Sequence, residues 1–240
     1  MTDPAKFGNP VEGWTPPETP NQIAFLGRYA RLERLNADQH AVDLHRANAA
    51  DDRIWDYLPY GPFASAAEYR RWAEGSAAGD DPIFYAIRDE ETGHFGGVAS
   101  FLRIKPEAGS IEVGHINLSA EIQRTRAATE ALYLMMKWVF QAGYRRFEWK
   151  CNALNLGSRR AAERLGFSYE GVFRQHLVVK GRNRDTAWFA MIDSEWPALQ
   201  SAFETWLRPE NFDAEGRQIT RLSDLTRPIR ITDDPALHPA

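Results

Sequence analysis

Strand-like and helix-like segments alternate between residues 28 and 207, and this alternation limits the folds that the chain can adopt. Its most informative part is a strand-like segment at 111–118 followed by a long helical segment at 126–142. Apolar residues recur at helical spacing along the second segment and form so wide a stripe that the helix is expected to be mostly buried. Gly143 then supplies a natural helix end. A buried helix after a strand predicts a sheet with helices on its faces.

The remaining segments extend this pattern in both directions. Further strands are expected at 28–35, 83–88, 95–104, 147–151, 167–179 and 185–192, the last two as a hairpin. Further helices are expected at 38–50, 65–78, 155–166 and 194–207, with Asp38, Ser65, Asn155 and Ser194 as their N-caps. The order of these segments predicts an α/β (α+β) fold class with a mixed sheet.

Proline-rich ends flank this alternating region. Prolines and few periodic apolar residues in 1–27 predict an N-terminal extension, part of which lies against the body. Residues 209–240 combine prolines with many charges and are expected to form a loosely ordered C-terminal tail. The folded domain is therefore expected to span 28–208.

Composition excludes several classes of protein. The formal net charge is −4, from 29 basic and 33 acidic residues, so no overall field attracts nucleic acid or an anionic membrane. Cys151 is the only cysteine, which rules out an intrachain disulfide and is typical of a reducing compartment. No apolar run approaches the roughly 18 residues of a membrane span, and the N-terminus lacks the pattern of a secretory signal. We therefore expect a cytoplasmic protein without nucleic-acid or membrane partners.

Two segments carry a family resemblance. The first, 111–130, contains Gln-Arg-Thr-Arg-Ala-Ala at 123–128, and the second, 152–167, contains Asn155, Ser158 and a Leu-Gly-Phe end at 165–167. Together they resemble the cofactor core of the GNAT superfamily of N-acetyltransferases, and within it the ribosomal-protein N-terminal (RimJ/RimL-like) branch. The resemblance implies a mixed, mostly antiparallel central sheet of about seven strands flanked by helices.

The same resemblance implies an activity. The chain would be an acetyl-CoA-dependent N-acetyltransferase that uses no metal. It would move an acetyl group to a primary amine by direct transfer in a ternary complex. The acceptor could be the α-amine of a protein, peptide or amino acid, or a small-molecule amine, and a homodimer is possible. A non-catalytic acyl-CoA-binding or protein-interaction module is the alternative, supported by Arg126 and the long terminal segments.

Arg126 is where the chain departs from the family pattern Gln/Arg-x-x-Gly-x-Gly/Ala. Gln123 and Ala128 match, whereas Arg126 replaces the central glycine. Backbone N–H groups at a helix start can bind a diphosphate without glycine, provided that the turn does not need a positive φ at this position. The cofactor-binding residues that the resemblance implies are Leu118, Ser119, Ala120, Gln123, Arg124, Thr125, Arg126, Ala127, Ala128, Asn155 and Ser158. Arg159 and Arg160 either join them at the phosphates or face solvent.

Two residues are the candidates for catalysis. Glu112 lies on the central strand, where several GNAT members carry the carboxylate that removes a proton from the amine. Its alternative role is that of a sheet residue paired with an arginine. Ser158 matches the serine of the Asn-x-x-Ser motif and could donate to the departing thiolate, or it could only cap the helix.

The acceptor is expected beside the aromatic loop 51–63, which borders the acceptor site in this family. Trp55 and Tyr57 could stack on the amine, with the acidic residues of the loop attracting it, or they could anchor the loop to the body. By resemblance, Arg174 and Trp188 would form the opposite wall. His115 is a reserve base or substrate contact, with a structural histidine as the alternative. Cys151 is expected to be a buried, inert thiol.

Overall fold

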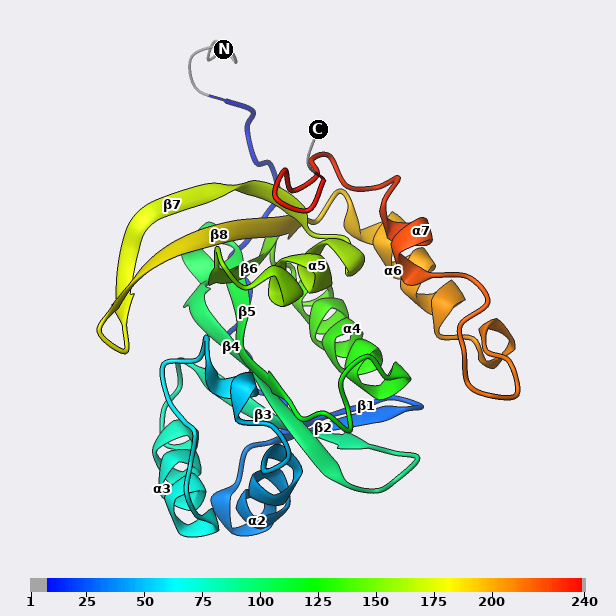
Figure 1. Cartoon of the computed structure of the whole chain (residues 1–240). Helices are drawn as coiled ribbons and strands as arrows, with labels where there is room; N and C mark the ends of the chain where they lie inside the picture. Colours follow the sequence, from blue (N-terminus) through cyan, green and yellow to red (C-terminus); the bar gives the residue numbers. More distant parts are fainter. Residues whose placement is uncertain (1–7, 239–240) are drawn as a thin grey trace.

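The computed structural model describes residues 8–238, so residues 1–7 and 239–240 of the expected extension and tail lie outside the described residues. Within 8–238, eight strands form one sheet in the spatial order β1-β2-β3-β4-β5-β6-β8-β7 (Figure 1). Neighbouring strands are antiparallel except β5 and β6. The strands are β1 (Ala24–Leu26), β2 (Ala30–Arg34), β3 (Ile83–Asp89), β4 (Phe95–Lys105), β5 (Ser110–Leu118), β6 (Arg146–Asn152), β7 (Ser168–Val179) and β8 (Arg182–Ile192).

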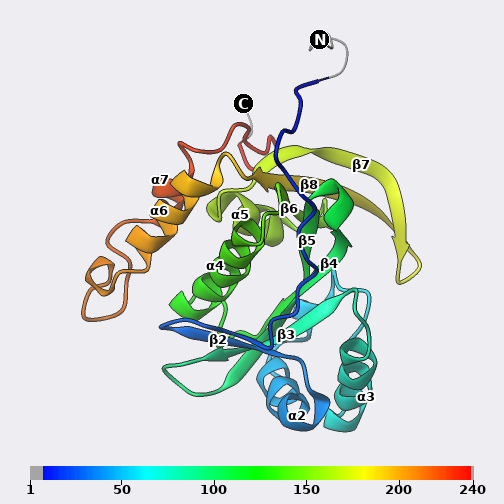
Figure 2. The ribbon, with the colours of Figure 1, turned by 180° about the vertical axis from the view of Figure 1, so that it is seen from behind.

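Helices cover both faces of this sheet (Figures 1 and 2). On one face lie α2 (Ala37–Asn48) and α3 (Ala66–Ala77), and on the other lie α4 (Arg126–Gln141), α5 (Leu156–Arg164) and α6 (Trp196–Trp206). The short helices are η1 (Asp52–Trp55), η2 (Pro106–Ala108), η3 (Pro209–Asn211) and α7 (Leu222–Thr226). None of the helices within 8–238 has the length and apolar character that crossing a bilayer requires.

The expected mixed, mostly antiparallel sheet is confirmed, and β1 adds an edge strand from within the segment 1–27. Two predicted N-caps are wrong. Asn36, not Asp38, caps α2, because its side chain accepts hydrogen bonds from the N–H groups at the helix start. Ser194 caps nothing, since α6 begins after Glu195 without a side-chain cap and with a proline in its first turn.

The central strands are buried on both faces, which explains their continuous apolar character. Phe84 and Ala86 of β3 belong to the core under α2 and α3. Tyr85 and Ile87 alternate with them and belong to the larger core under α4. This larger core also receives the apolar stripe of α4, so the helix that the sequence predicts to be buried packs against the sheet, closest to β2 and β3.

The parallel pairing of β5 and β6 is short, and this positions the site. Ser110–Val113 pair with Arg146–Trp149, and the described register continues no further between these two strands. Beyond Val113, β5 stays paired with β4 and β6 stays paired with β8. His115 has a φ of 50°, next to a register shift between β4 and β5. The two strands therefore diverge, and the edge of β5 that faces β6 is left without a strand partner.

The expectation of a loosely ordered C-terminal tail is wrong for residues 209–238. Asp234 is fully buried and forms a two-pronged ion pair with Arg159 of α5, with N–O distances of 2.5 Å. Its backbone N–H donates to Glu163 of the same helix at 2.6 Å. The tail thus packs against α5, where it supplies the counter-charge for a buried arginine.

Breaking this ion pair should destabilise the protein far more than breaking a surface pair. We expect Asp234→Ala to lower the free energy of unfolding by about 3–5 kcal/mol, because Arg159 stays buried without a counter-charge. Glu74→Ala is the matched control. It breaks the exposed pair with Arg70 on α3 and should cost no more than about 1 kcal/mol. Urea denaturation measures the free energy of unfolding of both variants. Equal decreases would contradict the stabilising role of the Arg159–Asp234 ion pair.

Candidate active site

The start of α4 presents free backbone N–H groups to a cavity. Thr125 is the N-cap, and its Oγ1 accepts a hydrogen bond from the N–H of Ala128 at 3.1 Å. The N–H groups of Arg126 and Ala127 precede the first intrahelical bond, so they have no partner within the helix. Both residues line the cavity. Together with the helix dipole, these groups favour an anion at this position.

Arg126 has the helical backbone that the missing glycine made uncertain, because it is the first residue of α4. The positive φ in this loop, 64°, belongs instead to Arg124. The guanidinium of Arg126 lies over the rings of Tyr29 and Phe212, at 4.8 and 5.0 Å from their centroids, and pairs with Glu91 at 3.2 Å. The side chain is thereby held by neighbours beside the helix start.

The cavity has a volume of about 970 Å³ and lies between α4, α5, α6 and the segment 212–221. Its lining is strongly basic. It includes Arg124, Arg126, Arg160, Arg164, Arg217 and Arg221, against Asp89 and Glu91. Within residues 8–238, only Arg126 and Arg217 of these arginines form ion pairs with carboxylates. Such a lining suits a polyanion, because guanidinium groups bind phosphate oxygens through two N–H groups at once.

Arg164 is the least solvated of these arginines. Burial lowers its pKa, its guanidinium lies 5.0 Å from the centroid of the Trp206 ring, and Nη1 donates to Thr129 at 3.2 Å. No carboxylate pairs with it among the described residues. A charge held in this way stabilises the protein least when the cavity contains only water and most when an anion is present.

The loop before α4 forms hydrogen bonds within itself, so fewer of its backbone groups are free for a cofactor than the family resemblance implies. Gln123 Nε2 donates to the carbonyl of Leu118 at 2.8 Å. The carbonyl of Ser119 accepts from the N–H groups of Ile122 and Gln123, and its N–H donates to Gly96. The backbone of Ser119 is therefore not free for a cofactor. Ala120 is exposed outside the cavity, whereas Leu118 lines it.

Ser158 and Asn155 lie at the start of α5, directly after β6. Asn155 is the N-cap, and its Oδ1 accepts from the N–H of Ser158 at 3.0 Å. Ser158 Oγ accepts from the indole N–H of Trp149 at 3.0 Å, and the Ser158 side chain also hydrogen-bonds to the Cys151 thiol, which opposes the rise in the pKa of that thiol. Ser158 faces β6, while Gly157, Arg160 and Ala161 of the same helix line the cavity.

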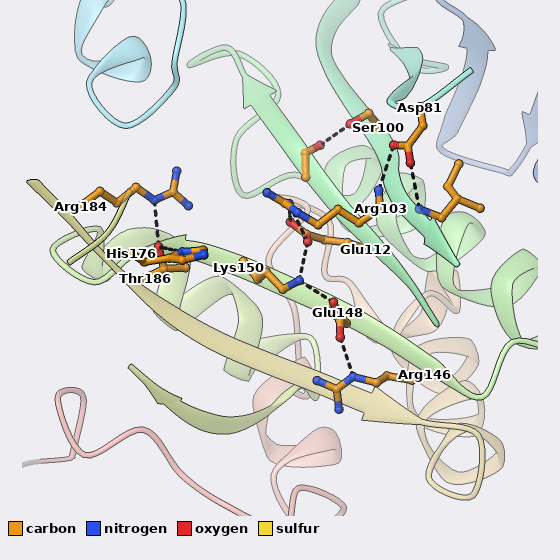
Figure 3. Close-up of polar contacts among 12 residues, drawn as sticks. Asp81, Ser100, Arg103, Glu112, Arg146, Glu148, Lys150, His176, Arg184 and Thr186 are labelled. Carbon is orange, nitrogen blue, oxygen red and sulfur yellow. Dashed lines mark hydrogen bonds and ion pairs between the residues drawn. The ribbon is translucent and has the colours of Figure 1, made fainter. Parts of the chain in front are cut away.

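Glu112 belongs to a row of alternating charges (Figure 3). It points away from α4, because its neighbours Ile111 and Val113 belong to the core under that helix. Its carboxylate lies 2.8 Å from Arg103 of β4 and 2.9 Å from Lys150 of β6, and only 3% of its side chain is exposed. Lys150 also pairs with Glu148 at 2.6 Å. We call this set the charge row, and its members are Arg103, Glu112, Lys150, Glu148, Arg146 and Glu170.

The two central carboxylates of the charge row differ in basicity. Burial raises the pKa of Glu112, and Lys150 and Arg103 offset only part of the rise. Burial also acts on Glu148, but Lys150 and Arg146 outweigh it and lower the pKa of that carboxyl group. Glu112 is thus the better proton acceptor, and it lies one residue before the point where β5 and β6 diverge.

The predicted acceptor residues are only partly brought together. Trp55 is wrong as a stacking platform, because 3% of it is exposed and its ring packs among Tyr60, Phe63 and Tyr69. Tyr57 is exposed at 37%, and its hydroxyl donates to the carbonyl of Leu154 after β6.

The β7–β8 hairpin reaches the same loop. Lys180 at its tip donates to the carbonyl of Trp55 at 2.9 Å, so hairpin and loop together border the sheet face that carries Glu112. Trp188 of β8 lies on this face, with Lys150 Nζ 3.8 Å from its ring centroid. Arg174 of β7 is exposed. The predicted wall therefore consists of Trp188 rather than of both residues.

Sequence reasoning missed Arg103, Lys150, Arg164 and Arg184. Lys150 could have been found, because it stands on the strand that neighbours β5 and shares the face of Glu112 through strand alternation. Arg103 reaches the same face only because its φ of 47° breaks the alternation of β4. Cys151 is a buried thiol whose pKa burial raises to about 11, which confirms that it is inert.

His115 is half-buried between aromatic rings. Its ring stacks on Tyr60 at 5.6 Å and lies 5.1 Å from Phe84, and Nδ1 is 3.2 Å from the Tyr60 hydroxyl. Burial, with Arg103 and Arg184 nearby, lowers its pKa to about 4. The imidazole is therefore neutral at neutral pH.

This neutrality makes the stability of the protein pH-dependent. The unfolded chain binds a proton at His115 near pH 6.5, but the folded chain resists protonation down to about pH 4. The contribution of neutral His115 to the free energy of unfolding is therefore fully present above about pH 6.5. It decreases as the pH falls, and about 2 kcal/mol of it is lost at pH 5. Asparagine tolerates the positive φ at this position. We therefore expect His115→Asn to lose about 2 kcal/mol less free energy of unfolding than the wild type between pH 7.5 and pH 5. Denaturant titrations at each pH check this, and an unchanged slope would count against it.

Comparisons with known proteins agree with the fold. A family model described as an acetyltransferase (GNAT) domain matches residues 30–168. A GCN5-related N-acetyltransferase from Brucella melitensis is 47% identical, with a TM-score of 0.88 over 90% of this chain and 100% of that chain. A probable acetyltransferase of the GNAT family from Chromobacterium violaceum is 39% identical, with a TM-score of 0.75 over 79% and 96% of the two chains.

A more distant structure shares the fold alone. The microcin C7 self-immunity acetyltransferase MccE, in complex with acetyl-CoA and AMP, is 20% identical, with a TM-score of 0.62 over 69% of this chain and 93% of that chain. No match was found among curated proteins. The family model spans more than half of the chain, and the Brucella structure aligns over nearly all of it. This chain therefore belongs to the GNAT family of acetyltransferases.

Proposed function

We propose that this acetyltransferase is an acetyl-CoA-dependent N-acetyltransferase that acts on a primary amine by direct transfer in a ternary complex. One observation carries the proposal. β5 loses its pairing with β6 one residue after Glu112, which leaves a gap between the two strands, and β5 then leads through residues 119–125 to the free N–H groups at the start of α4. A thioester carrier bound with its diphosphate at α4 would reach the Glu112 carboxylate through the gap.

The residues around the basic cavity fit a CoA nucleotide. Arg126 and Ala127 would bind the diphosphate through their backbone N–H groups. Arg160 and Arg164 of α5, with Arg221 from the C-terminal segment, would neutralise the remaining phosphate charge. The bound carrier supplies the activated acetyl group as a thioester. The chain's own task is to hold this group beside the amine, which by itself supplies much of the rate.

Glu112 would remove the proton that the amine must lose. An ammonium ion is not a nucleophile, so a base is needed near neutral pH. The raised pKa of Glu112 makes its carboxylate a better base than a solvated glutamate. Lys150 and Arg103 hold that carboxylate in one orientation and keep it ionised until it accepts the proton.

Ser158 would assist the departing sulfur. Its oxygen accepts from Trp149, and its hydroxyl hydrogen, which hydrogen-bonds to the Cys151 thiol, would turn to donate to a thiolate at the end of the gap. Direct transfer is favoured over a covalent enzyme intermediate because the only cysteine, Cys151, is buried and its pKa of about 11 keeps it protonated.

Glu112→Gln is the decisive variant. We expect it to lower kcat by about 10²-fold or more, since general-base catalysis typically contributes 10²–10⁴, while the affinity for CoA stays nearly unchanged. Glu148→Gln is the matched control, because it removes the other carboxylate that pairs with Lys150. It should keep most of the activity. Release of free thiol from acetyl-CoA with an amine panel measures kcat, and calorimetry measures CoA affinity.

Three outcomes separate the alternatives. Equal losses in both variants would assign Glu112 a structural role in the charge row. Binding of CoA without transfer to any amine would favour the non-catalytic acyl-CoA-binding module. Failure to bind any acyl-CoA would overturn the proposal.

Arg164 provides a separate test of cofactor binding. We expect Arg164→Gln to weaken the binding of CoA at least tenfold and to reduce its salt dependence, because the variant removes a poorly solvated charge from the cavity. Arg227→Gln, an exposed arginine of the segment after α7 that does not line the cavity, is the control and should bind CoA normally. Thermal denaturation confirms that both variants fold. Unchanged affinity in Arg164→Gln would place the nucleotide elsewhere.

The narrower resemblance to the ribosomal-protein N-terminal acetyltransferases, a cytoplasmic location and a homodimer stay predictions. The same holds for the boundaries 1–27, 28–208 and 209–240. An acceptor α-amine, as that branch would imply, is one member of the class that the proposal covers.

A further inference from the structure

The sheet face that carries Glu112 also carries an arginine without a counter-charge. Strand pairing places Lys150 of β6 beside Trp188 of β8, and Asn152 beside Thr186. Side chains alternate along β8, so Arg184 points to the same face as Thr186 and Trp188. Figure 3 shows Arg184, Thr186 and His176 grouped on one side of Lys150 and Glu112.

The charge row is balanced without Arg184. Its three cations and three carboxylates alternate, and each carboxylate lies within 2.9 Å of a cation. Arg184 joins none of these pairs. The adjacent Asp185 is occupied elsewhere, since its carboxylate accepts from the N–H of Gln175 and from the side chain of Asn183. Arg184 is therefore the surplus positive charge of this face.

The terminal nitrogens of Arg184 are free among the described residues. Only Nε makes a hydrogen bond, to Thr186 Oγ1 at 3.3 Å. This leaves the two Nη groups, the end of the guanidinium that binds a carboxylate through two parallel N–H donors. The side chain is half-buried, and burial with the nearby Arg103 lowers its pKa. A guanidinium nevertheless stays charged at any physiological pH.

The neighbouring histidines do not supply the missing negative charge and add no positive one. His176 lies 3.0 Å from Thr186, and burial together with Arg184 lowers its pKa. His115 is neutral for the same reasons. The face thus offers one carboxylate near the gap, Glu112, and one unpaired guanidinium to its side.

We propose that the acceptor is a small primary amine that also carries an anionic group, with Arg184 binding the anion and Glu112 receiving the proton of the amine. This rests on the proposed acetyl transfer. A carboxylate, as in a free amino acid, and a phosphate share the chemistry that Arg184 recognises. The surrounding cations repel a second ammonium group, so polyamines are poor acceptors. The same cations lower the pKa of the bound ammonium group and thereby favour loss of its proton.

Pairs of amines that differ only in charge test this with the wild-type protein. Each amino acid of a panel is compared with its carboxamide, and O-phosphoethanolamine is compared with ethanolamine, at fixed acetyl-CoA. We expect kcat/KM to be at least tenfold higher for the anionic member of at least one type of pair. The carboxylate and phosphate arms show which anion is preferred.

Variants of Arg184 assign the preference to this residue. Arg184→Gln should remove the preference by lowering kcat/KM for the anionic amine and not for its neutral partner, and Arg184→Lys should restore part of it. If the substitution only impaired folding, kcat/KM would fall by the same factor for the anionic amine and for its neutral partner. Arg182→Gln, an exposed arginine near the hairpin tip, is the control and should keep the wild-type ratio.

The outcomes distinguish this inference from the function on which it rests. Equal kcat/KM for both members of every pair, or a preference that survives in Arg184→Gln, would overturn the anionic acceptor and leave acetyl transfer intact. Binding of acetyl-CoA without transfer to any amine would overturn both. Preferred acetylation of polyamines would also refute the anionic acceptor.

Discussion

The brief parallel contact between β5 and β6 is the constraint from which the rest of the site follows. Four residue pairs hold the two strands together, and the break in β5 at His115 then turns them apart. The pairing aligns Glu112 with the lysine-bearing strand, and the divergence opens the edge of β5 next to α4. A longer parallel pairing would satisfy more backbone groups but would close the route from the basic cavity to the carboxylate.

Burial does opposite work on the two sides of the sheet. On the α4 side burial is largely apolar and stabilises the fold. The other side has an apolar core under α2 and α3, but next to it burial removes water from the charge row, so that each charge must be matched by a neighbour. Glu112 has a raised pKa within this set, whereas Glu148 has a lowered one, because the balance of burial against cations differs between them. Two glutamates on the same face can therefore differ in role, because the one that is more desolvated has the higher pKa and is the better base, while the other remains a structural anion.

Much of this fold could be predicted from the sequence, because its strands and helices follow local rules. The stripe of α4, the cap at Asn155 and the helix end at Gly143 each depend on residues within a few positions. The errors have a common origin in distant partners. The sequence suggests that Trp55 contacts the acceptor, but its ring packs against Tyr69 of α3 and against Tyr60 and Phe63 of the loop that follows it. The order of the tail depends on Arg159, which lies 75 positions before Asp234. Arg103 reaches the site because of its positive φ, and this backbone conformation could not be predicted from the residue type.

The attachment of Asp234 to α5 has a consequence for how the protein is made. The helix α5 lacks the counter-charge of its buried arginine until the segment around Asp234 has been synthesised and has left the ribosome. A nascent chain that ended before residue 209 would contain every strand of the sheet and still lack the part of the cavity wall that residues 212–221 supply. The strands are therefore made before the cavity can be complete.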